Sequence, residues 1–270
     1  MKTKKYVLWI LAAVITLASV FYQRKTGPTY PKRIKQQIEN IEYSFKLPRS
    51  FGGTADCPIE IEISDKTISG QIFYKKYPSN DEWLSSSLAR ENNFLKTSLP
   101  NQPPAGKLEY YIVLNKGSNS YEISKSNPLK IRFKGEVPAW ALIPHVLFMF
   151  IAMFLSNVAG LFAFARFDKY KFYTTLTFIA LLIGGMILGP VVQKFAFNEF
   201  WTGVPFGWDL TDNKTLIGFV FWTIAIAANY KKDKPYLVIV AAIMLLLIYC
   251  IPHSMFGSEL DHATGQVGQG

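Results

Sequence analysis

The stretch Val137–Ala165 has the sequence VPAWALIPHVLFMFIAMFLSNVAGLFAFA and contains no formally charged side chain. A helix that crosses the hydrocarbon core of a bilayer needs about 20 residues, so this stretch is long enough to span a membrane. Four further stretches are free of formal charge: Tyr6–Gln23, Phe172–Gln193, Thr215–Tyr230 and Pro235–Ser258. We therefore expect five membrane-spanning helices, of which the fourth is short unless it begins near Thr211 or Asp212.

The first apolar stretch has features of both a cleaved signal peptide and an uncleaved anchor. Three lysines lie within residues 1–5, and small residues lie near Ala18. Both classes of segment begin with a basic region that is followed by an apolar one. We expect an anchor over residues 6–23, preceded by a cytoplasmic N-terminus of residues 1–5.

The distribution of basic residues predicts the orientation. The chain carries 29 Lys and Arg against 19 Asp and Glu, a formal net charge of +10. With the N-terminus inside, the short cytoplasmic segments (residues 1–5, 166–171 and 231–234) hold nine Lys or Arg, whereas the short outer segments hold two. Cytoplasmic connectors of membrane proteins are enriched in basic residues. We therefore expect a bacterial inner-membrane protein with residues 24–136 and the tail, residues 259–270, in the periplasm, and no nucleic-acid partner.

Residues 24–136 have the pattern of a β domain. Ile59, Ile61 and Ile63 alternate with polar residues, which is typical of a half-buried strand. Similar runs occur at Ile41–Leu47, Thr67–Tyr77, Phe94–Leu99, Lys107–Leu114 and Pro128–Lys134. About seven short strands at this spacing resemble an immunoglobulin or fibronectin-III module. The expected fold is a five-span α-helical membrane bundle with an extracytoplasmic all-β sandwich.

The β domain shows no recognisable catalytic arrangement, since it has no histidine and a single cysteine, Cys57. The second cysteine of the chain, Cys250, lies in an apolar stretch, so a disulfide framework is excluded. We interpret the β domain as a docking module for another membrane or periplasmic protein. The sequence leaves open whether the chain is an enzyme.

Two of the three histidines lie in the expected membrane domain, residues 137–258. His145 and His253 each follow an Ile-Pro pair, and His262 lies in the tail. Under the expected topology all three lie on the outer side. Ionisable side chains at membrane depth usually face a bundle interior, and two histidines at matching depth favour a shared ligand. Asn157 lies midway along the second apolar stretch, and we expect it to form a hydrogen bond between helices.

The outer loop of the membrane domain, residues 194–214, is rich in aromatic residues. It contains Trp201, Phe206 and Trp208-Asp209, and Lys214 leads into the next apolar stretch. This pattern resembles the tryptophan-rich WWD loop of the heme-handling proteins of cytochrome c maturation. Trp201, Trp208 and Asp209 match that loop, and Phe206 stands in the place of one tryptophan.

The resemblance implies that His145 and His253 bind heme iron, because histidines from flanking spans bind heme against the loop in that family. It further implies that the rings of Trp201, Phe206 and Trp208 stack on the macrocycle.

Charged side chains near the loop complete the hypothesis. Asp209 or Asp212 would accept the outer N–H of a heme-binding histidine. Lys214 is the cation nearest to a heme propionate, and Glu199 adds a further charge. The stretches Arg132–His145, Gly189–Thr215 and Ile251–Gly265 also resemble a group of uncharacterised bacterial inner-membrane proteins, from which no function follows.

The main functional hypothesis is an inner-membrane protein that holds heme at the outer leaflet, for heme handling or for electron transfer. The alternative is a non-catalytic accessory subunit of a membrane complex that docks through its β domain. A third hypothesis is a divalent-metal site at the outer rim, formed by Glu259, Asp261 and His262 with His253. Besides the lipid bilayer, we expect membrane or periplasmic protein partners.

Overall fold

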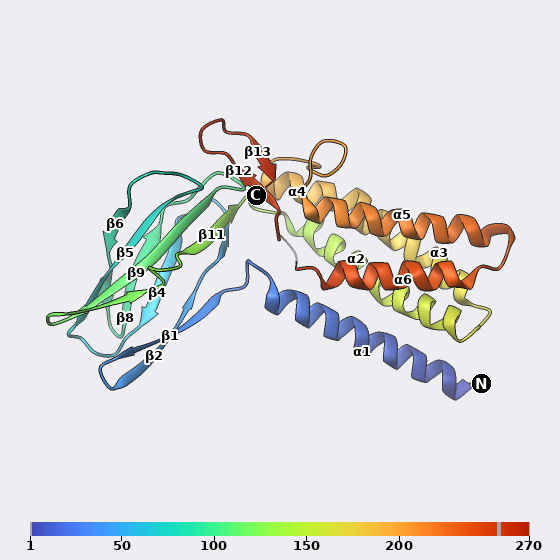
Figure 1. The fold of residues 1–270 in the computed structure, drawn as a ribbon, viewed down its shortest axis with the longest axis horizontal. Helices are drawn as coiled ribbons and strands as arrows, with labels where there is room; N and C mark the ends of the chain where they lie inside the picture. Colours follow the sequence, from blue (N-terminus) through green and yellow to red (C-terminus); the bar gives the residue numbers. More distant parts are fainter. Residues whose placement is uncertain (1, 253–254, 270) are drawn as a thin grey trace. The chain divides into compact units, whose positions relative to one another are not determined.

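The computed structural model describes residues 2–252 and 255–269, which form two compact units. A helical unit contains residues 2–28 and 137–257, and a β unit contains Thr29–Glu136 together with Ser258–Gly268. The β unit is therefore built from two segments that are far apart in the sequence (Figure 1).

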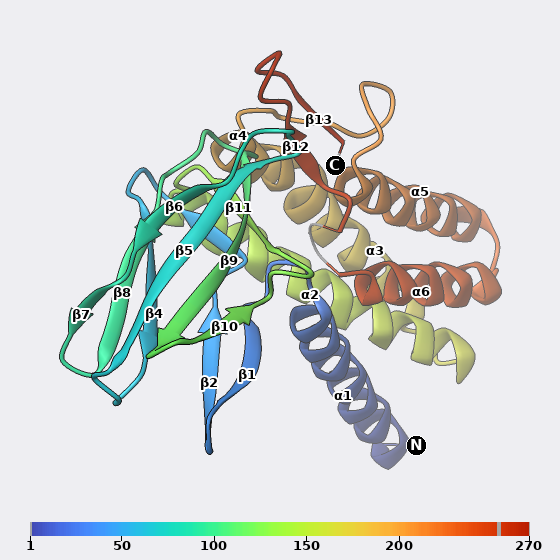
Figure 2. The same ribbon diagram turned by 60° about the vertical axis from the view of Figure 1, so that its left-hand side comes forward.

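The first segment of the β unit forms eleven strands. They are β1 (Lys32–Ile38), β2 (Ile41–Leu47), β3 (Ser50–Gly52), β4 (Cys57–Glu62), β5 (Ile68–Tyr77), β6 (Leu84–Ser87), β7 (Ala89–Glu91), β8 (Phe94–Leu99), β9 (Lys107–Lys116), β10 (Asn119–Ile123) and β11 (Leu129–Lys134). The largest sheet has the order β3-β11-β9-β5-β6, and β10 also pairs with β9. Figure 2 shows β9 between β5 and β11. A second sheet has the order β4-β8-β7, and β1 pairs with β2 alone.

Alternation of apolar and polar residues explains the core of the β unit. Along β4, buried and exposed residues alternate strictly, which places Ile59 and Ile61 on one face. Both contact the same buried cluster as Ile72 of β5 and Ile112 of β9. Burial of each such side chain contributes about 1.5–3 kcal/mol. The strands predicted around Ile59, at Ile41–Leu47 and at Phe94–Leu99 are confirmed.

The predicted immunoglobulin-like or fibronectin-III-like sandwich is wrong. The strands of residues 29–136 are divided among three sheets, one of which is the isolated β1–β2 hairpin. In addition, β3 pairs with β11 in parallel, through Phe51 and Phe133. Alternation indicates which side of a strand is buried, but it does not determine the strand beside which it lies.

The C-terminal segment adds two strands to the β unit, β12 (Ser258–Leu260) and β13 (Val267–Gln269). The backbone N–H of Leu260 donates to the carbonyl of Ala105 (3.1 Å). The ammonium of Lys107 on β9 forms an ion pair with Glu259. Residues expected to be a tail are therefore part of the β unit.

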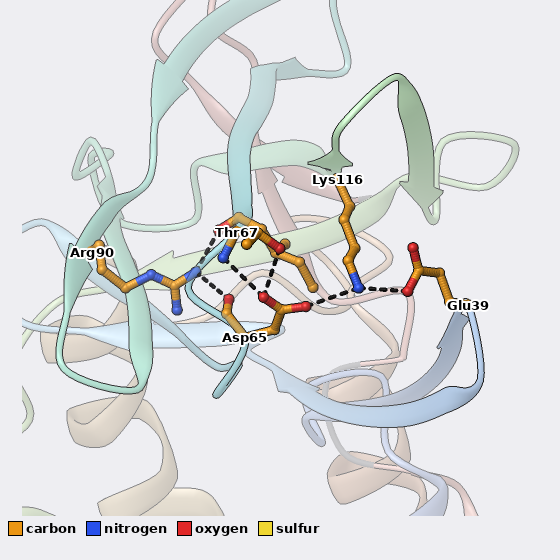
Figure 3. Close-up of polar contacts among 6 residues, drawn as sticks. Glu39, Asp65, Thr67, Arg90 and Lys116 are labelled. Atoms are coloured by element: carbon orange, nitrogen blue, oxygen red, sulfur yellow. Dashed lines mark hydrogen bonds and ion pairs between the residues drawn. The ribbon is translucent and has the colours of Figure 1, made fainter.

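A cluster of polar side chains joins the β1–β2 turn and the β4–β5 turn to strand β7 and to the end of β9 (Figure 3). The carboxylate of Asp65 accepts hydrogen bonds from the backbone and the hydroxyl of Thr67 (2.9 and 2.6 Å). Lys116, at the end of β9, lies 2.9 Å from Asp65 and 2.5 Å from Glu39 in the β1–β2 turn. The guanidinium of Arg90 donates to the carbonyls of Ile63 (2.6 Å), Asp65 (3.0 Å) and Ile68. The cluster thus fixes the turn between β4 and β5.

The helical unit contains α1 (Lys2–Thr26), α2 (Ala139–Phe164), α3 (Tyr170–Leu181), a π-helical segment η1 (Leu182–Leu188), α4 (Gly189–Phe197), α5 (Leu210–Lys231) and α6 (Pro235–Cys250). Because α3, η1 and α4 follow one another without a break, they form one continuous helix.

Small residues and aromatic rings pack these helices. A Cβ atom added to Gly160 of α2 would lie 2.6 Å from Ala242 of α6, so the two helices approach closely there. Trp222 of α5 is completely buried. The amide of Asn157 donates to the hydroxyl of Thr16 on α1 (3.0 Å), which confirms the predicted hydrogen bond between helices.

The predicted five-span bundle is wrong. Among the described residues, three helical segments are long and apolar enough to cross a membrane: Thr3–Thr26, Ala139–Phe164 and Tyr170–Phe197. Helix α6 has 16 residues, which corresponds to about 24 Å at 1.5 Å per residue and is shorter than a hydrocarbon core of about 30 Å. Helix α5 carries Asp212 in its first turn, the buried Lys214 in its second turn and Lys231 in its last turn. Counting stretches without formal charge therefore overestimated the number of membrane-spanning helices.

We predict that the β unit loosens at acid pH through Asp65. Hydrogen bonds from Thr67 and the ammonium of Lys116 hold the pKa of Asp65 well below its usual range. A carboxyl with a depressed pKa in the folded state stabilises that state above its unfolded pKa, about 3.9, and this contribution is lost as the pH falls further. Asp65→Asn should accelerate hydrogen exchange of the backbone amides in the β4–β5 turn at neutral pH. It should also make this exchange rate less sensitive to acid pH than in the wild type.

Hydrogen exchange of the full chain, corrected for the intrinsic effect of pH, measures this outcome. Glu62→Gln, an exposed carboxylate on β4, is the matched control and should behave as the wild type. Equal acid dependence in Asp65→Asn and in the wild type would contradict the prediction.

Candidate functional site

The loop between α4 and α5, residues 198–209, is organised by one carboxylate. Asp212, which is 5% exposed, accepts hydrogen bonds from the backbone N–H and the hydroxyl of Thr202 (2.7 and 3.2 Å). It also accepts from the N–H of Gly203 (3.1 Å) and from the side-chain amide of Gln193 on α4 (3.0 Å). Asp212 therefore joins α4, the loop and the first turn of α5.

Neighbouring polar side chains at the start of α5 also form structural hydrogen bonds. Asp209 is the N-cap, and its carboxylate accepts from the N–H groups of Thr211 (2.7 Å) and Asp212 (3.4 Å). Lys214, which is 5% exposed, donates to the carbonyl of Ile251 (3.1 Å). A cation at the end of a helix interacts favourably with its last carbonyls, so Lys214 stabilises the C-terminus of α6.

Two glycines allow the loop to fold tightly against α5. A Cβ atom at Gly203 would lie 2.7 Å from both Asn213 and Asp212, and one at Gly207 would lie 2.4 Å from the carbonyl of Thr202. These glycines therefore serve the loop's own packing.

The outward side of the loop is apolar. Phe200, Val204, Phe206 and Trp208 are 57%, 41%, 81% and 72% exposed. Trp201 is partly buried, and its indole N–H donates to the carbonyl of Val204 (3.1 Å). The loop thus directs most of its polar groups inward and presents exposed aromatic side chains outward.

His145 lies on α2 beside the π-helical segment. Its Nδ1 lies 2.8 Å from the carbonyl oxygen of Gly184. A carbonyl can only accept, so Nδ1 of the neutral ring carries the proton and Nε2 retains its lone pair. A Cβ atom at Gly184 would lie 2.8 Å from Cβ of Phe148, so glycine is needed for this approach of η1 to α2.

The π-helical segment and the loop are about one helical turn apart. A Cβ atom at Gly189, the first residue of α4, would lie 3.8 Å from the His145 ring. Gln193, four residues further along α4, contacts Thr202 and Asp212. Four residues of helix rise about 6 Å. His145 therefore lies about one turn below the loop.

The structure assigns several predicted site residues to different contacts. The carbonyl of Gly184 takes the position beside His145 that was expected for Asp209 or Asp212. Lys214 donates to the carbonyl of Ile251, directly after the end of α6, and Glu199 is exposed. His253, the second expected iron ligand, lies outside the described residues.

The third hypothesis, a metal site at the rim, includes His253, which lies outside the described residues. Within the described residues, no group of three or more His, Cys, Asp or Glu side chains is arranged to hold a metal ion. Glu259 is paired with Lys107, and Asp261 accepts backbone hydrogen bonds within its own turn.

Sequence analysis missed Gly184, Gln193 and Thr202. The Gly184-Gly185 pair inside an apolar stretch was the available signal, since paired glycines allow close helix contact. The bonds of Gln193 and Thr202 depend on the loop conformation, for which the sequence has no direct signal.

No protein-family model matches this chain, and no curated protein matches it. The resemblance to the WWD heme-handling family therefore remains a prediction.

We predict that Asp212→Ala disorders the loop. The change removes the acceptor of the part-buried N–H of Thr202 and of the buried N–H of Gly203, and a buried donor left without an acceptor costs about 1–3 kcal/mol. Hydrogen exchange of residues 200–208 should accelerate strongly. Asn213→Ala, which removes only the acceptor of the exposed Val204 N–H, should have a smaller effect. Similar exchange in Asp212→Ala and in the wild type would show that the carboxylate does not organise the loop.

Proposed function

We propose that this chain is an integral inner-membrane protein that holds heme next to the loop between α4 and α5, with Nε2 of His145 as a ligand of the iron. The observation that carries the proposal is the hydrogen bond between Nδ1 of His145 and the Gly184 carbonyl. A metal-binding histidine commonly donates its other ring N–H to a carbonyl or carboxylate, which fixes the tautomer and orientation. Bound heme supplies an iron centre for reversible holding or electron transfer.

The loop supports the proposal through its outward surface. Phe206 and Trp208 present exposed rings that can stack on a flat apolar macrocycle. Asp209, Asp212 and Lys214 are engaged in contacts of the loop and of α6, so the proposal assigns them no contact with heme. Their part is to hold the ring-bearing loop in one conformation.

A partner-docking accessory subunit is the second candidate, and a cavity in the β unit favours it. This cavity of about 350 Å³ exposes mainly apolar surface, and its lining includes Tyr74, Leu84, Pro100 and Leu108 as well as the charged or polar residues Lys75, Lys76, Asp81, Glu82 and Gln102. Leu84 is 59% exposed at the sheet edge formed by β6. An apolar side chain of a partner protein fits a cavity of this character.

The absorption spectrum of the purified chain tests the heme proposal. Protein from heme-replete cells should show a Soret band, and His145→Ala should weaken or shift it, because the iron loses a nitrogen ligand. Imidazole added to His145→Ala should restore part of the band.

His262→Ala is the matched control, since His262 belongs to the β unit, and it should leave the spectrum unchanged. If the wild type remains colourless after reconstitution with heme, the proposal fails and the docking candidate takes its place. An unchanged band in His145→Ala would exclude His145 as the ligand.

A further inference from the structure

One end of the helical unit gathers the start of α1, the α2–α3 connection and the α5–α6 connection. The ammonium of Lys5 lies 5.5 Å from the centre of the Phe167 ring, which joins α1 to the α2–α3 connection. The hydroxyl of Tyr170 donates to Asn229 (3.0 Å) and Asp233 (3.3 Å), and Lys171 lies 2.5 Å from Asp233. These contacts hold the three segments together at what we call the basic end.

The basic end has a large excess of positive charge. Its acidic side chains are Asp168 and Asp233, and its described basic side chains are Lys4, Lys5, Arg166, Lys169, Lys171, Lys231, Lys232 and Lys234. Eight basic against two acidic residues give a formal charge of +6. Within the part of the chain that the structure describes, Lys171 is the one basic residue of this end that forms an ion pair. The remaining cations are available to an anion from outside the chain.

The opposite end of the helical unit is nearly neutral. Its acidic residues are Glu199, Asp209 and Asp212, and its basic residues are Arg24, Lys25, Lys194 and Lys214. Four basic against three acidic residues give a formal charge of +1. The excess of cations is therefore a property of one end and not of the helical unit as a whole.

Arg166 occupies a backbone position that glycine would fill with less strain. Its φ is +55°, and α2 ends there with hydrogen bonds from the N–H of Arg166 to Ala163 (3.2 Å) and from the N–H of Phe167 to Phe162 (2.9 Å). Glycine is the usual residue at this left-handed position after a helix. The guanidinium is exposed, so solvent weakens any interaction of its charge with the last carbonyls of α2. The side chain adds a positive charge to the α2–α3 connection, which also carries Lys169.

We propose that the basic end binds the headgroups of anionic phospholipids, with Arg166, Lys169 and Lys232 as principal contacts. The position of the basic end, as well as its charge, favours a lipid headgroup as the ligand. Residues 3–26, 139–164 and 170–197 are long and apolar enough to cross a bilayer, and each begins or ends at the basic end. When these helices cross a bilayer, the cations lie at the depth of the phosphate groups. Clusters of Lys and Arg next to membrane helices bind anionic lipids.

Competition between spin-labelled lipids tests this proposal on the full chain. The chain is reconstituted in phosphatidylcholine, and the association of labelled phosphatidylglycerol is compared with that of labelled phosphatidylcholine with identical acyl chains. Phosphatidylglycerol should be favoured several-fold at low ionic strength, and the preference should shrink at high salt, which screens exposed charges. Equal association of the two lipids at low salt overturns the proposal.

Two variants and a matched control localise the effect. The triple variant Arg166→Gln, Lys169→Gln, Lys232→Gln should lose most of the several-fold preference, because each lost charge weakens the attraction to anionic headgroups. The control Arg24→Gln, Lys25→Gln, Lys194→Gln removes the same charge from the opposite end and should keep the preference. Arg166→Gly should lower the preference while the thermal unfolding temperature stays equal or rises, because glycine relieves the strained φ. A preference that survives in the triple variant and in Arg166→Gly, or that falls equally in the control, overturns the proposal.

Discussion

Close approach between helices at glycine is the constraint on which the helical unit depends. The lack of a side chain at Gly160 lets α2 pack against Ala242 of α6. A Cβ atom added to Gly218 of α5 would lie only 2.9 Å from Leu245 of α6, so these two helices also approach closely. Gly184 does the same between η1 and α2. In apolar surroundings helices gain little from hydrophobic burial, so contact area and polar bonds hold them together. The bond between His145 and Gly184 follows from this packing, because a side chain at residue 184 would push the two segments apart.

The sequence allowed the strands to be located better than their partners. The predicted limits of β2 and β8 match the observed strands, because two-residue alternation is visible along a single segment. The parallel pairing of β3 with β11 and the contact of Leu260 with Ala105 join residues far apart in the chain. Such contacts are set by tertiary packing, for which a single sequence contains no periodic signal.

The helices show a similar limit. Lack of charge identified the apolar segments correctly, but it did not distinguish the 16-residue α6 from longer helices. At the candidate site, the position of His145 could be singled out, whereas its bond to a carbonyl of a π-helical segment could not. Loop carboxylates such as Asp212 are equally ambiguous in sequence, because a cap and a ligand-binding group use the same residue type.

The inclusion of Ser258–Gly268 in the β unit has a consequence for how the chain can be threaded through a bilayer. The β unit is one compact body, so its two segments must lie on one side of any membrane. The chain leaves this body after Glu136 and rejoins it at Ser258, and the intervening residues must therefore cross the bilayer an even number of times. The candidate spans Ala139–Phe164 and Tyr170–Phe197 meet that condition as a pair. The remaining span, Thr3–Thr26, has no such counterpart, and when it crosses the bilayer it leaves the first residues of the chain on the side opposite the β unit, together with the α2–α3 connection.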